Sequence, residues 1–178
     1  HIRNVVKQTR KIGVNETMTL SCKFGELKAH DKGLQFDFLT TAKINGEVVM
    51  EGLTTYLARQ KTDGSVQPKV KEENVPDYQL KAVWDVAENT GDFNLIHIHA
   101  VTAKAFGFKQ AIAHGMWSKA RALASLELPD AYEADVHFKL PMFLPSKVEF
   151  LTAEQKDNTQ ILIRNEKSQK PHVAGVLK

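Results

Sequence analysis

The densest group of side chains suited to acid–base chemistry lies in the run TGDFNLIHIH, residues 90–99. Asp92 and His97 stand five positions apart there, in a stretch whose composition is typical of a loop. Such a loop can bring a carboxylate and an imidazole to one small volume, where they can hold a water molecule and move its protons. The pair predicts general acid–base catalysis. The alternative that the spacing leaves open is ordinary turn formation by Asp-Phe-Asn.

A second feature is the run AIAHGM, residues 111–116, where an apolar segment enters a predicted helix. Backbone N–H groups at the start of a helix lack intrahelical partners and carry the positive end of its dipole, so they can stabilise a developing oxyanion. Gly115 has no Cβ and lets a ligand carbonyl come close. The alternative is structural: Gly115 permits tight helix–sheet packing, and His114 caps the helix.

The elements that must position these residues differ between the two halves of the chain. Three runs between Thr17 and Arg59 alternate apolar and polar residues and are rich in β-branched side chains, which is typical of strands. The pair Asn45-Gly46 predicts a tight hairpin between the last two of these runs, because both central residues of that turn need positive φ. We therefore expect strands and no long helix in residues 1–60.

The second half has a different pattern. A polar, proline-containing linker over residues 61–79 is followed by a predicted domain over residues 80–178, with one strand, a helix near residues 114–127 and four further strands. This order predicts an α+β fold in which an antiparallel sheet wraps a central helix. Residues 1–60 look like a partial copy of that layout, without its opening strand and helix. The apolar stripe of the helix is predicted to contain Met116, Trp117, Ala120, Leu123 and Ala124.

Composition excludes several classes of protein. The chain has 178 residues, of which 42% are hydrophobic and 25% charged, as expected for a globular domain and not for a disordered or fibrous chain. The net charge of +3 is too small and too scattered for a nucleic-acid-binding surface, and no apolar run is long enough to span a membrane. The single cysteine, Cys22, excludes an intrachain disulfide and favours a cytoplasmic location. The chain begins at His1, which is consistent with a piece of a longer gene product.

Both motifs together, in this order, resemble the MaoC-like family of hotdog-fold acyl-CoA hydratases and dehydratases, which includes the (R)-specific enoyl-CoA hydratases. The resemblance rests on TGDFNLIHIH, AKAFGF and IAHGM, and on the tail HFKLPMFLPSKVEF. It covers the chain from Trp84 to the C-terminus. More faintly, residues 1–59 resemble the degenerate first hotdog of double-hotdog members. The resemblance implies a hotdog fold, with a partial or degenerate second hotdog at the N-terminus.

The resemblance also implies roles for single residues. Asp92 and His97 match the catalytic pair of the family, and Gly115 matches the glycine whose amide binds the thioester oxygen. The implied reaction is reversible syn addition of water to a trans-2-enoyl-CoA, giving an (R)-3-hydroxyacyl-CoA, with no metal or redox cofactor. As substrate-binding residues in the same two motifs we take Asn94, His114 and Met116.

The implied partner is an acyl-CoA or another acyl thioester, with no nucleic acid and no membrane. A partial first hotdog would leave a sheet edge unpaired, so the sequence also predicts a homodimer or higher oligomer.

Three alternatives compete with the hydratase hypothesis. Leu95 replaces a proline of the family motif and His99 replaces an aspartate, which favours an acyl-thioester-binding or scaffolding subunit without turnover. His97, His99 and His114 could instead bind a metal ion. A thioesterase would need a carboxylate early in the helix, whereas the first acidic residue there is Glu127.

Overall fold

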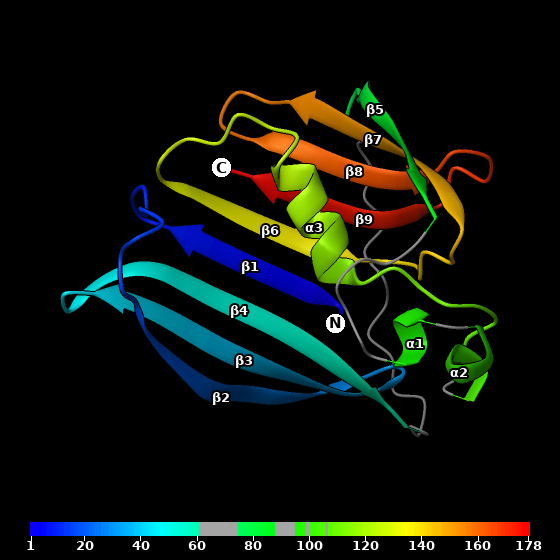
Figure 1. Ribbon diagram of the computed structural model, residues 1–178, viewed down its shortest axis with the longest axis horizontal. Helices are drawn as coiled ribbons and strands as arrows, with labels where there is room; N and C mark the ends of the chain where they lie inside the picture. The colour runs from blue at the N-terminus through cyan, green and yellow to red at the C-terminus, as the bar shows by residue number, and fades with distance from the viewer. Residues whose placement is uncertain (61–74, 88–94, 99, 106) are drawn as a thin grey trace. The chain divides into compact units, whose positions relative to one another are not determined.

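The computed structural model describes residues 1–60, 75–87, 95–98, 100–105 and 107–178 (Figure 1). These residues form two compact units. The first contains His1–Pro76, Leu128–His137 and Leu177–Lys178, and the second contains Asp77–Glu127 and Phe138–Val176. Each unit is built on an antiparallel sheet, as the sequence predicts.

The sheet of the first unit has the strand order β2-β3-β4-β1-β6, with every neighbouring pair antiparallel. No helix occurs among the described residues of this unit. The strands are β1 (Arg3–Gln8), β2 (Thr19–His30), β3 (Gly33–Ile44), β4 (Glu47–Arg59) and β6 (Tyr132–Phe138).

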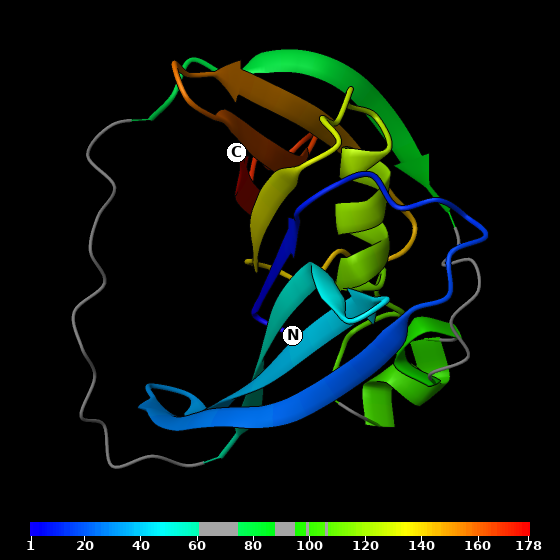
Figure 2. The same cartoon turned by 90° about the vertical axis from the view of Figure 1, so that its left-hand side faces the viewer.

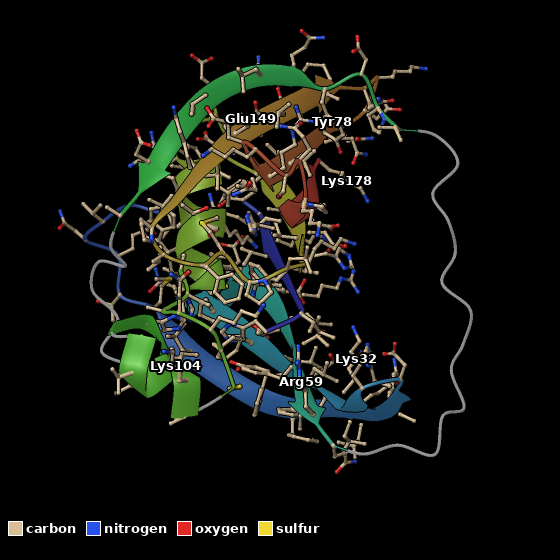
Figure 3. All side chains as sticks on the ribbon, turned by 90° about the vertical axis from the view of Figure 1, so that its right-hand side faces the viewer. Lys32, Arg59, Tyr78, Lys104, Glu149 and Lys178 are labelled. Atoms are coloured by element: carbon tan, nitrogen blue, oxygen red, sulfur yellow. The ribbon has the colours of Figure 1, made fainter. Side chains whose placement is uncertain are left out.

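The predicted hairpin joins β3 to β4. Asn45 and Gly46 have φ values of 53° and 85°, and Ile44 pairs with Glu47 across the turn. Both central residues thus adopt the positive φ that the sequence predicts for this turn. At the opposite end of the sheet, the Gln60 N–H donates to the carbonyl of Lys32 at 3.2 Å, where Lys32 and Arg59 lie close together (Figure 3).

One face of this sheet carries an aromatic cluster formed by Phe24, Phe36, Phe38 and Tyr56. Phe24 pairs across the strands with Phe38, and Phe36 pairs with Tyr56, so strand register places the four rings on the same side. Phe36 stacks on Tyr56 at a centroid distance of 5.4 Å. Phe24 lies on the outermost strand and is 60% exposed.

The second unit combines a sheet with three helices. Its strands follow the order β9-β8-β7-β5. Figures 1 and 2 show α3 running across the face of this sheet, with β5 curving over one side of the helix. The elements are β5 (Gln79–Val86), α1 (Leu95–Ile98), α2 (Ala100–Ala105), α3 (Gly115–Leu123), β7 (Ser146–Glu154), β8 (Thr159–Asn165) and β9 (Pro171–Leu177).

Buried apolar side chains of neighbouring strands form the core of the second sheet. Phe150 on β7 is fully buried and stacks on Trp84 of β5, and Phe150 pairs with Ile163 of β8. On β7, Glu149 (Figure 3) accepts a hydrogen bond from Arg164 Nε at 2.7 Å. Residues 150–153 of β7 are buried in succession, so both faces of this part of the strand are covered, whereas burial alternates along β8.

The two sheets share a strand meander. In the first unit β2, β3 and β4 are neighbours in chain order, and in the second unit β7, β8 and β9 are. In the second unit β5 lies outside β7, and α3 follows β5 in the chain. Among the described residues, the first unit has no strand outside β2 and no helix. The layout agrees with the α+β fold predicted from the sequence.

Candidate active site

The predicted site residues fall into two groups. Asp92 and Asn94 lie outside the described residues, as does His99. His97, His114 and the residues that follow it belong to the second unit. The structure therefore gives the geometry of the site for the imidazoles of His97 and His114 and for the first residues of α3.

His97 belongs to α1, a short helix where the sequence predicts a loop. Its side chain is 6% exposed, and its Nδ1 lies 2.6 Å from the carbonyl oxygen of Ile112. A carbonyl only accepts, so Nδ1 carries the proton and donates to Ile112. In the neutral ring Nε2 then has the lone pair, which is the arrangement that a general base needs.

A second hydrogen bond fixes the segment that holds His97. The Ile112 N–H donates to the carbonyl of Ile96 at 3.1 Å. Ile112 thus binds α1 through both its N–H and its C=O, once to the backbone and once to the imidazole. These two bonds hold His97 against the segment that leads into α3.

His114 is the N-cap of α3. Its φ of −69° and ψ of 132° are extended, and its Nδ1 accepts a hydrogen bond from the Met116 N–H at 3.1 Å. This satisfies one of the backbone donors left without a partner at a helix start. The ring of His114 also meets that of His97 edge to face, with centroids 5.0 Å apart and planes at 74°. The capping role that the sequence left open for His114 is confirmed.

Gly115 is the first residue of α3, at a place where a side chain does not fit. A Cβ built on Gly115 would lie 2.9 Å from Cδ1 and 3.0 Å from Cε1 of Phe138. The structural explanation for Gly115, that it permits tight packing of the helix, is therefore confirmed. It does not replace the chemical explanation, because helix geometry gives the Gly115 N–H no acceptor within α3.

The phase of α3 differs from the prediction. Ala120 and Ala124, placed on the apolar stripe, are exposed, and the helix ends at Leu123. Its buried side chains are instead Ser118, Lys119 and Ala122.

Ser118 and Lys119 are 2% and 3% exposed, and sequence reasoning missed both. The only signal for them is their spacing of three and four residues from Gly115, which places them on the same face of the helix.

The described residues test the competing hypotheses only in part, because His99, one of the three histidines of the metal hypothesis, lies outside them. Within these ranges, no three His, Cys, Asp or Glu side chains are grouped so that they could hold a metal ion. Glu127 is exposed and follows the end of α3. No described helix is long and apolar enough to cross a membrane.

Comparison with known proteins places the chain among acyl-thioester enzymes. Residues 67–171 match the sequence family described as "MaoC like domain". The chain is 30% identical over 189 residues to 3-hydroxyacyl-thioester dehydratase X of Mycobacterium tuberculosis, and the alignment covers 100% of this chain and 68% of that protein.

Solved structures are similar over the whole chain. The crystal structure of HtdX from Mycobacterium tuberculosis matches with a TM-score of 0.86 and 30% identity, over 100% of this chain and 75% of the other. The peroxisomal multifunctional enzyme type 2 of Drosophila melanogaster matches with a TM-score of 0.79 and 16% identity, over 100% of this chain and 36% of the other. The second likeness concerns the fold alone.

Proposed function

The chain belongs to the MaoC-like dehydratase family and has its hotdog fold, and we propose that it catalyses the reversible syn hydration of trans-2-enoyl-CoA to (R)-3-hydroxyacyl-CoA. The coarser part of this statement, a hydro-lyase acting on acyl thioesters, follows from the family and from the relative's name. The choice of CoA, the stereochemistry and the residue roles are our proposal.

The observation that carries the proposal is the state of His97. A buried imidazole whose Nδ1–H is held by a backbone carbonyl can take up and release a proton only through Nε2. The ring is thus oriented and its tautomer fixed before substrate arrives. A general base whose tautomer and orientation are fixed in this way can accept a proton at a defined position.

In the proposed reaction Asp92 and His97 hold one water molecule next to the β-carbon of the enoyl group. As the water oxygen bonds to that carbon, His97 Nε2 takes one of the water protons, and the electrons of the double bond move toward the thioester carbonyl. The Asp92–His97 pair then returns a proton to the α-carbon on the same face, which leaves both residues in their starting protonation states. The sum is addition of H and OH across the double bond, and dehydration follows the same steps in reverse.

The Gly115 amide is proposed to stabilise the negative charge that develops on the thioester oxygen. It lies at the positive end of the α3 dipole. Asn94, His114 and Met116 are proposed to contact the substrate around this point. His114 and Met116 are half-buried beside Gly115.

We further propose a double-hotdog architecture in which the first unit is the degenerate copy. The shared meander supports this proposal, and so does the missing counterpart of β5 and α3 among the described residues. Strand β2 is exposed along nearly its whole length at the edge of its sheet. Because open edges favour pairing with another chain, we expect a homodimer or higher oligomer. We propose a cytoplasmic location because Cys22 is the single cysteine.

The test is hydration of crotonyl-CoA in D₂O. Loss of the enoyl-thioester absorbance measures turnover, NMR of the product gives the relative configuration at C2 and C3, and chiral chromatography of the hydrolysed product gives the absolute configuration at C3. Syn addition with R configuration at C3 is the expected result. Turnover with the S configuration or with anti addition would contradict the stereochemical part. Binding without turnover would favour the scaffolding alternative raised by Leu95 and His99.

A further inference from the structure

We propose that His114 is a positioning residue that orients the catalytic imidazole of His97, in addition to capping α3. The effect on catalysis rests on the proposed function. The structural part, that one ring holds another in place, stands without it. It is carried by three observations on the second unit.

The first observation is that the two histidines use Nδ1 in opposite ways. His97 Nδ1 donates to the Ile112 carbonyl, whereas His114 Nδ1 accepts from the Met116 N–H. The neutral rings are therefore different tautomers, with the proton on Nδ1 in His97 and on Nε2 in His114. Each tautomer is set by a backbone group, so neither ring can exchange its role with the other without losing a hydrogen bond.

The second observation is the contact between the rings. The edge-to-face contact at 5.0 Å places the His114 ring against the His97 ring at a position other than Nδ1, and this packing opposes tilting of the His97 ring. Nε2 of His97 is then aimed in one direction, which a proton-transfer group requires.

The third observation is that a single rigid segment supplies both restraints. Residues 112–115 contribute the carbonyl that binds His97, the ring that packs on it and the proposed oxyanion amide. This segment is itself held by the residues after β6. Ala113 N–H donates to Met142 C=O and Leu144 N–H donates to Ala111 C=O, both at 2.8 Å. Residues 112–115 thus position both the proposed general base and the proposed oxyanion donor.

Two substitutions separate the roles of His114. In His114→Asn the side-chain oxygen can still accept from the Met116 N–H, because Asn is a strong N-cap residue, but the ring contact is lost. His114→Phe keeps a ring beside His97 and loses the cap acceptor. The variants are compared by thermal unfolding and by kcat and KM for crotonyl-CoA.

We expect the two readouts to rank the variants in opposite order. His114→Asn should keep Tm close to that of the wild type and lower kcat about 100-fold, with KM changed much less. His114→Phe should lower Tm by about 2–4 °C, because a cap is lost, while its kcat falls by less than about tenfold. If kcat follows Tm in both variants, His114 is only a structural cap and the proposal is wrong.

A measurement without substrate keeps this test separate from the proposed function. In protein labelled with ¹⁵N-histidine, the imidazole shifts report which nitrogen carries the proton, and His97→Gln identifies the His97 signals. We expect the Nδ1–H tautomer for His97 in both proteins, because the Ile112 carbonyl sets it. In His114→Asn the Nδ1–H proton of His97 should exchange with water at least about tenfold faster than in the wild type, because the ring is held less firmly. An unchanged exchange rate would overturn the inference, even if the wild type hydrates crotonyl-CoA. Absent turnover with the expected faster exchange would refute only the proposed function.

Discussion

The two units share a strand meander but differ in what connects their strands. In the first unit, β2, β3 and β4 follow one another through tight turns, such as that at Asn45-Gly46. In the second unit, the chain between β5 and β7 contains α1, α2 and α3, and with them His97 and Gly115. The sheet is a common scaffold. The candidate chemistry depends on the segment inserted after one strand.

The burial of apolar side chains also differs between the two units. Leu20 and Phe24 on β2 are 64% and 60% exposed, whereas Phe150 on β7 and Ile161 on β8 are almost fully buried. All four belong to strands with alternating apolar residues, so the pattern alone does not determine burial. In the second unit β5 pairs with β7, and α3 lies on the sheet. A strand pattern becomes a core only when another element covers it.

The largest expected effect tests whether the chemistry belongs to the second unit alone. His97→Gln should lower kcat/KM for crotonyl-CoA by about 10²–10⁴-fold, because it removes the proposed general base while leaving a polar side chain in place. The matched control is His30→Gln in the first unit, which should leave kcat/KM within about twofold of the wild type. Similar losses in both variants would show that the units are not divided in this way.

A glycine in each unit gives the next comparison. Gly115→Ala should lose about 1–3 kcal/mol of unfolding free energy, because its Cβ would meet Phe138 at 2.9 Å, and should lower kcat as α3 shifts. In Gly52→Ala on β4, the nearest atom to the new Cβ is 3.6 Å away, on Thr40, so no clash is expected. Urea unfolding and the hydration assay should both distinguish the variants. Equal stability would contradict the packing argument.

A smaller effect concerns how the stability of the second unit depends on pH through His172. Burial lowers the pKa of His172 below 6.5, although the backbone carbonyls of Leu140 and Pro141 partly oppose this shift. Among the described residues its Nε2 is buried without a hydrogen-bond partner. The unfolded chain therefore binds a proton more readily than the folded one. The stabilising contribution of neutral His172 is complete above pH 6.5 and is lost as pH falls toward the lowered pKa of the folded state.

Unfolding in urea at several values between about pH 5.5 and 7.5 measures this effect. We expect His172→Leu to have a flatter dependence of stability on pH than the wild type. Gln160→Leu, on β8 of the same unit, removes no titratable group and serves as the control, so it should keep the wild-type slope. A wild-type slope in His172→Leu would assign the acid sensitivity to another group.

The smallest effect on stability is expected from one arginine–carboxylate ion pair in each unit, and it should be similar in the two units. Arg3 binds Asp135 through two hydrogen bonds of 2.9 and 2.6 Å in the first unit, and Arg164 binds Glu149 at 2.7 Å in the second. Arg3→Lys and Arg164→Lys should each cost at most about 1 kcal/mol of unfolding free energy, less at high salt, because the pairs are partly exposed. A clearly larger loss in either variant would show that this pair is more important to its unit than its exposure indicates.

Local sequence signals predicted the strands and turns well. The Asn45-Gly46 hairpin and the start of a helix at His114-Gly115 both depend on a few neighbouring residues, so the sequence suffices for them. The predicted end of α3, near residue 127, was wrong, because the helix ends at Leu123. Beyond Leu123 the chain continues in tighter turns, with Leu126 N–H bonded to the Leu123 carbonyl.

Features set by tertiary contacts were not predictable. Apolar periodicity placed Ala120 inside, but the structure buries Ser118 and Lys119, because the face that begins at Gly115 points inward. The helical turn at His97 likewise depends on hydrogen bonds to Ile112, fifteen residues later. Asp92 and Asn94 lie outside the described residues, so their roles stay predictions.

The most direct measurement of the central claim is the rate at which wild-type protein and Asp92→Asn consume crotonyl-CoA under saturating conditions. We predict steady turnover by the wild type and a loss of at least about 100-fold in Asp92→Asn, with binding of the thioester retained. Equal rates for the two proteins would contradict this prediction, since the carboxylate proposed to act together with His97 would then have no part in the reaction.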